Sequence, residues 1–73
     1  MTGIITVDAR GFSCPRPAMM VNEAISKTPS GVLEVLVDSV TSRDNVIRLA
    51  QRSGWTFAVE PIPNSEFKVV LNK

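Results

Sequence analysis

The residue with the clearest chemical potential is the single cysteine, Cys14, which is followed directly by Pro15-Arg16-Pro17. Proline is disfavoured inside a helix but favoured at its first position, and a helix-like pattern runs from Pro17 to about Lys27. We therefore predict that Cys14 is the N-cap of this helix, where unpaired N–H groups and the helix dipole favour a thiolate. The alternative is a small buried apolar side chain, since free cysteines are often buried.

The residues that follow the cysteine should shape its surroundings. If Cys14 is the N-cap, Pro15 and Pro17 occupy positions N1 and N3, and the amide of Arg16 is the only one left in capping range. Arg10 and Arg16 add positive charge nearby in the sequence, which would favour a thiolate or a persulfide anion. The alternative for both arginines is solvated surface charge.

Two residues before the cysteine are candidates for shaping the loop. Gly11, three residues before Cys14, would supply a positive φ or clear space above the thiol, or it is an ordinary loop glycine. Asp8 ends the first predicted strand. We expect it to accept amide hydrogen bonds from the loop in an Asx-type contact rather than to act in acid–base catalysis.

An exposed apolar patch is predicted beside the cysteine. On a helical wheel Met19 points away from the apolar stripe, which would leave it exposed about one turn from Cys14. With Phe12 and Ala18 it would form a surface that meets partner proteins. The alternative is a stray apolar residue on the surface.

The composition limits the function classes. The 73 residues suit one domain, residues 1–73, and one cysteine excludes an internal disulfide. Without histidine, neither a Cys-His pair nor a Ser-His-Asp triad nor the usual zinc site can form, so we expect no metal or cofactor. A net charge of +1 gives no reason to expect nucleic acid. No secretory leader or membrane-length apolar run is present, so we predict a cytoplasmic protein.

The hydrophobic pattern predicts the element order βαβαββ. The strands are expected at residues 4–7, 32–37, 55–60 and 66–71. The helices are expected at 17–27 and from Thr41-x-x-Asp44, which resembles a capping box, to a cap at Gly54. Residues 32–37 are almost continuously apolar, which predicts a central strand covered on most of both faces. A turn at 61–65 would join the last two strands as an antiparallel hairpin. The fold class is therefore α/β (α+β), a two-layer sandwich with both helices on one face of the sheet.

Residues 8–17 resemble a known signature, D-x-x-G-x-x-C-P-x-P, of the TusA-like (SirA/YedF/YeeD) sulfur-carrier family. The resemblance covers essentially the whole chain, and the second half is similar to the N-terminal domain of YedF-type proteins linked to selenium metabolism. It implies a mixed four-stranded sheet and Cys14 as the residue that carries a persulfide. It also implies a sulfur-donor protein such as a cysteine desulfurase, and an acceptor protein on a route to tRNA thiolation, a cofactor or another sulfur pathway.

Two positions depart from the family pattern. TusA itself often has Glu between the two prolines, where this chain has Arg16, and an Asp-Asp-Pro stretch after the second strand, where this chain has Asp38-Ser39-Val40. Both departures bear on which donor and acceptor are used and leave the carrier chemistry intact.

Three functional hypotheses follow. The first is a small sulfur carrier, a sulfurtransferase-type persulfide relay rather than a self-sufficient enzyme, since thiol exchange needs a thiolate and access but no internal base. The second is a protein- or RNA-binding regulatory module in which Cys14 is structural or a redox sensor. The third is selenium carriage on the same thiolate.

Overall fold

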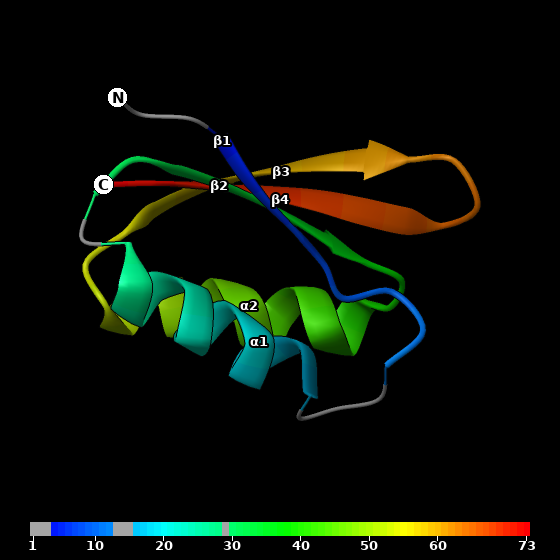
Figure 1. The fold of residues 1–73 in the computed structure, drawn as a ribbon. Helices are drawn as coiled ribbons and strands as arrows, with labels where there is room; N and C mark the ends of the chain where they lie inside the picture. Colours follow the sequence, from blue (N-terminus) through cyan, green and yellow to red (C-terminus); the bar gives the residue numbers. More distant parts are fainter. Residues whose placement is uncertain (1–3, 13–15, 29) are drawn as a thin grey trace.

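The computed structural model describes residues 4–12, 16–28 and 30–73. Its elements follow the order βαβαββ (Figure 1), which confirms the prediction. They are β1 (Ile4–Asp8), α1 (Arg16–Lys27), β2 (Val32–Val37), α2 (Val40–Arg52), β3 (Thr56–Ile62) and β4 (Glu66–Asn72).

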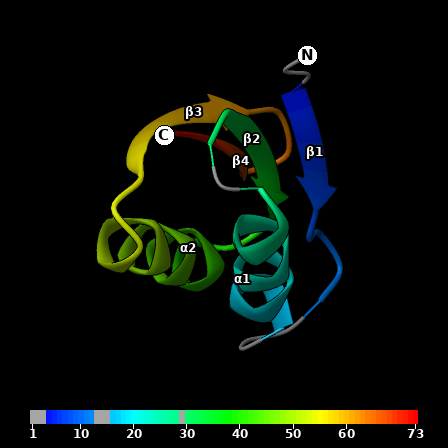
Figure 2. The ribbon, with the colours of Figure 1, turned by 60° about the vertical axis from the view of Figure 1, so that its left-hand side comes forward.

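The four strands form one mixed sheet in the order β1-β2-β4-β3. β1 and β2 are parallel, whereas β4 is antiparallel to both β2 and β3. Both helices lie on the same face of the sheet (Figures 1 and 2), as predicted. β1 and β3 are therefore the two edges of the sheet, and α1 lies on the β1 side of the helical layer (Figure 2).

The core lies between the sheet and the helices. Leu33, Val35 and Val37 point into it from β2 and are fully buried, while the alternate residues of β2 are half-buried. β2 is thus central, as predicted, but the predicted cover of both its faces is only partial, because the helices lie on one face. The other core side chains are Ala9, Val21, Val46, Ala50, Trp55, Val69 and Leu71.

α2 begins earlier than the sequence predicts. Its N-cap is Ser39, whose Oγ accepts a hydrogen bond from the Ser42 N–H at 3.1 Å. Thr41 lies inside the helix, and the carboxylate of Asp44 is held by the neighbouring Arg43 at 3.0 Å. The predicted capping box is therefore wrong. Ser39 is an equally good cap, and the earlier start gives the buried Ser42 hydroxyl a partner, the Ser39 hydroxyl, at 3.0 Å.

The end of α2 agrees with the predicted glycine cap. Gly54 follows the C-cap residue Ser53 and has φ +80°, a conformation that glycine adopts without strain. The Trp55 N–H donates to the Ala50 carbonyl at 2.9 Å, and the Gly54 N–H donates to Gln51 at 3.2 Å. These two bonds form a Schellman motif and direct the chain into β3.

β3 is longer than predicted at its far end. Pro61 and Ile62, expected in the turn, continue the strand and pair with Phe67 and Glu66 of β4. β3 is an edge strand, so no neighbouring strand lies on its outer side. Proline is tolerated in edge strands because an N–H missing from that side leaves no ladder hydrogen bond unmade. The reversal is made instead by residues 63–65, where Asn64 has φ 70°.

Candidate functional site at the end of β1

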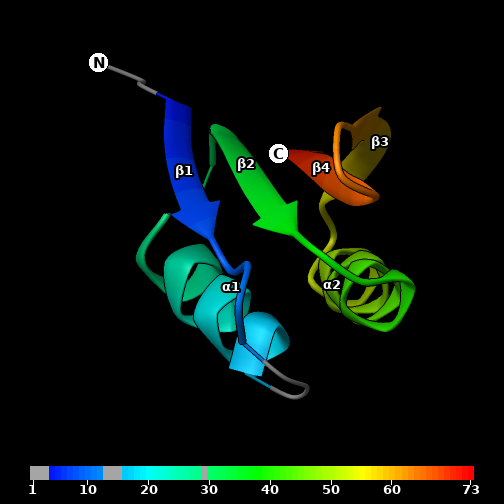
Figure 3. The ribbon, with the colours of Figure 1, turned by 90° about the vertical axis from the view of Figure 1, so that its right-hand side faces the viewer.

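The candidate site lies where β1 ends and α1 begins (Figure 3). The predicted N-cap Cys14 and the N1 residue Pro15 fall outside the described residues. Phe12 and Arg16 are the nearest described residues on either side, and each is two positions from Cys14 in the sequence. Pro17 is buried in the first turn of α1, as the wheel predicts.

A cation–π contact joins the two sides of this segment. The Cζ atom of Arg16 lies 5.3 Å from the centroid of the Phe12 ring. Both side chains are exposed, so the contact is worth about 0.5–1 kcal/mol. It connects the loop after β1 to the first turn of α1.

Asp8 and Arg10 form a two-pronged ion pair at the start of the loop. The Arg10 Nε and Nη2 atoms donate to the two carboxylate oxygens of Asp8, each at 2.9 Å, and the Arg10 amide donates to Asp8 Oδ1 at 3.2 Å. The amide bond is the predicted Asx-type contact. Hydrogen bonds from Arg10 lower the pKa of Asp8 to about 2, so this carboxylate stays ionised and is not a proton donor at neutral pH.

Arg10 also reaches a second carboxylate, from β4. Its Nη1 atom lies 3.2 Å from Glu66 Oε1, and both carboxylates raise the pKa of Arg10 further above its usual value. One cation thus faces two anions, which leaves this cluster with a net charge of −1. Arg10 therefore holds the loop in place through its ion pairs. Because these carboxylates neutralise its charge, Arg10 stabilises a thiolate less than the sequence predicts.

Position 11 requires glycine because of its backbone conformation and not because space is short. Its φ is +83°, and a Cβ atom placed on it would meet nothing within 4 Å. Its N–H donates to Asp38 Oδ2 at 2.7 Å. Asp38 follows β2 directly and is brought here because β1 and β2 are parallel, so their carboxyl ends share one edge. Asp38 is absent from the predicted site, although its position directly after the second predicted strand is a signal that the sequence offers.

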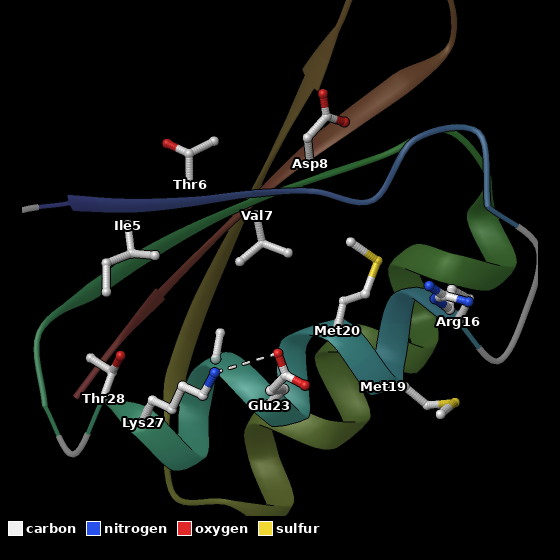
Figure 4. A pocket seen from close by; sticks show the side chains of 11 residues that line it. Ile5, Thr6, Val7, Asp8, Arg16, Met19, Met20, Glu23, Lys27 and Thr28 are labelled. Carbon is white, nitrogen blue, oxygen red and sulfur yellow. Dashed lines mark ion pairs between the residues drawn. The ribbon is translucent and has the colours of Figure 1, made fainter.

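Sequence reasoning also missed an open groove of about 740 Å³ between β1 and α1 (Figure 4). Ile5 and Val7 point from β1 toward α1, whereas Thr6 and Asp8 point away from it (Figure 4). All four line the groove, so it wraps around the strand edge. The helical wall comes from α1 and the residue after it: Arg16, Met19, Met20, Glu23, Ala24, Lys27 and Thr28.

The predicted apolar patch is exposed in its two larger members. Met19 is 61% exposed and Phe12 is 41% exposed, while Ala18 is half-buried. Met19 thus points away from the core, as the wheel predicts, and its role in partner contact stays a prediction.

Residues 5–73 match the family model described as Sulfurtransferase TusA. The chain belongs to the TusA family. It is 29% identical over 68 residues to a candidate sulfur carrier protein of Methanocaldococcus jannaschii, which covers 92% of this chain and 91% of that protein. The crystal structure of a SirA-like protein from Desulfitobacterium hafniense is 31% identical and superposes with a TM-score of 0.88, over 93% of this chain and 95% of that one.

Membership of the TusA family supports a sulfur carrier role. Within residues 4–12, 16–28 and 30–73, no group of three or more acidic, cysteine or histidine side chains is placed to hold a metal ion. Across that same part of the chain, no helix is long and apolar enough to cross a membrane.

Proposed function

We propose that this TusA-family chain carries sulfane sulfur as a persulfide on Cys14 and passes it to a partner protein. The observation that carries the proposal is the family match over residues 5–73, in a chain whose only cysteine stands in the C-P-x-P sequence. The cation–π contact between Phe12 and Arg16 supports it, because it involves a cation that is two residues from that cysteine in the sequence.

The transfer is a thiol exchange without net oxidation. The Cys14 thiolate attacks the outer sulfur of a donor persulfide, an S–S bond forms on Cys14, and the donor's S–S bond breaks. The donor leaves as a thiolate, and the transferred sulfur keeps its proton. The second transfer repeats this step with an acceptor thiolate, so the chain needs a stabilised anion but no internal base.

Arg16, two residues from Cys14 in the sequence, is the cation to which we assign the stabilisation of that anion. Unlike Arg10, it forms no ion pair with a carboxylate among the described residues, and its contact is with the Phe12 ring. An unpaired positive charge near a thiol favours the thiolate and the persulfide anion.

The finer assignments belong to the same proposal. The donor is a protein persulfide such as that of a cysteine desulfurase, and the acceptor is a second protein in a cytoplasmic pathway such as tRNA thiolation. The family's YedF-type members suggest selenium as an alternative cargo, which would use the same thiolate.

Intact-mass measurement tests the function directly. The chain is incubated with a cysteine desulfurase and cysteine, and we expect an adduct of one sulfur atom on the wild type. Cys14→Ser should carry none. An unmodified wild type, or an equal adduct on Cys14→Ser, would contradict the proposal and favour the regulatory-module hypothesis.

A further inference from the structure

The free edge of β1 has the features of a strand that pairs with another chain. β1 lies at one edge of the sheet, and its sequence, residues 4–8, contains neither proline nor lysine, which commonly protect such edges. The opposite edge strand, β3, carries Pro61. Ile4 and Ile5 are 60% and 43% exposed, so β1 presents large aliphatic side chains beside its open backbone.

The backbone of β1 directs hydrogen-bonding groups to that edge. The Ala9 N–H donates to the Leu36 carbonyl of β2 at 2.9 Å. Because N–H and C=O groups alternate in direction along a strand, those of Val7 also point to β2, and those of Thr6 point to the free edge. The Asp8 N–H points the same way. An added strand would find these groups in register.

The groove lies along the same edge and adds side-chain recognition. Ile5 and Val7 form the apolar part of its β1 wall (Figure 4), and Met20 and Ala24 line it from α1. An extended chain paired with β1 would place every second side chain over this apolar floor.

The charges of the groove indicate the chemistry of its occupant. Glu23 pairs with Lys27 at 3.6 Å, and Asp8 pairs with Arg10, which leaves Arg16 as the lining cation with no ion pair among the described residues. A carboxylate on the incoming chain would complement it. A second copy of this chain, added antiparallel through β1, would instead bring Arg16 of one copy level with the Glu23–Lys27 ion pair of the other, which offers no free carboxylate.

We infer that the edge of β1 and the adjoining groove bind an extended, largely apolar segment of the partner protein, with a carboxylate close to the cysteine that exchanges sulfur with Cys14. The inference rests on the proposed function. Arg16 lines the groove and is two residues from Cys14 in the sequence, so a segment added along β1 can carry its own cysteine to the Arg16 end of the groove.

Three persulfide donors test the inference. The first is a short peptide that alternates valine and threonine, contains one aspartate and ends in a cysteine persulfide. The second is the same peptide N-methylated at every residue before the cysteine, which has no N–H on either edge with which to pair as a strand, and the third is glutathione persulfide. We expect the first to transfer sulfur to the chain about tenfold faster than the other two, the gain from two or so backbone hydrogen bonds.

Substitution of Thr6 supplies the matched pair of variants. Thr6→Pro removes an N–H that β2 does not use, and proline is tolerated at an edge, so the sheet should remain folded, as a thermal melt will show. We expect Thr6→Pro to slow sulfur transfer from the unmethylated peptide until its rate equals that from glutathione persulfide. Thr6→Val keeps the N–H and the β-branched shape and should retain the fast transfer.

Each outcome has a distinct meaning. No transfer from glutathione persulfide would contradict the proposed function itself. Transfer from all three donors at one rate would overturn strand addition while leaving the function standing, even if Thr6→Pro fails to fold. Sedimentation of the wild type as a dimer that Thr6→Pro dissociates would assign the edge to a second copy and also overturn the inference.

Discussion

At the scale of single residues, the two arginines near the cysteine have different surroundings. Arg10 lies between the carboxylates of Asp8 and Glu66, so its charge is neutralised by two ion pairs that hold the loop. Arg16 contacts an aromatic ring and forms no ion pair among the described residues. We therefore assign the electrostatic support of the thiolate to Arg16 and the shaping of the loop to Arg10.

Charge reversal at Arg16 tests this assignment. Arg16→Glu should raise the pKa of the Cys14 thiol, because an anion now lies where a cation favoured the thiolate. The measurement is the rate of thiol alkylation against pH, with a midpoint that moves upward. Arg48→Glu makes the same charge change on the exposed surface of α2 and serves as the control. Equal midpoints for the two variants would show that Arg16 has no local effect.

The Asp8–Arg10 ion pair predicts a pH dependence of stability. The pKa of Asp8 in the folded state, about 2, lies below the ordinary value of 3.8. The contribution of the ion pair to the free energy of unfolding is therefore present above about pH 4 and is lost as the pH falls through 2. In urea unfolding at several pH values, Asp8→Asn should be less stable than the wild type at pH 6. The difference in the free energy of unfolding between the two proteins should disappear between pH 4 and pH 2. A gap that is constant with pH would argue against the pair as its source.

At the scale of elements, sequence patterns located all six helices and strands of the described fold but misplaced some of their ends. Thr41 and Ser39 are both good N-caps, and the choice between them depends on the buried Ser42 hydroxyl, which is a tertiary contact. Pro61 signals a turn by local preference, and it stays in β3 only because β3 is an edge strand. Local propensity cannot decide either case.

The corrected N-cap of α2 gives a prediction with a built-in control. Ser39→Ala removes the oxygen that accepts the Ser42 N–H and should lower the free energy of unfolding by about 1 kcal/mol. Thr41→Ala changes the residue that the sequence pattern favoured and should leave stability nearly unchanged. Chemical denaturation of both variants measures the difference, and a larger loss for Thr41→Ala would restore the original capping box.

At the scale of the whole molecule, the topology assembles what the sequence could only suggest. Cys14, Gly11 and Asp8 were identifiable because they are close in the sequence and belong to one signature. Asp38, just after β2, and Glu66, in β4, reach the same loop, and the groove exists only because β1 is an edge strand next to α1. These long-range neighbours depend on strand order, which no local pattern encodes.

The role proposed for Cys14 requires that it hold a transferable sulfur atom. The chain is loaded with glutathione persulfide, digested and mapped by mass spectrometry, and a loaded sample is then mixed with an acceptor thiol. We predict one added sulfur, located on the peptide that contains Cys14, and its loss to the acceptor at a rate that rises with acceptor concentration. A sulfur atom found elsewhere, or one on Cys14 that no thiol removes, would contradict the role of carrier.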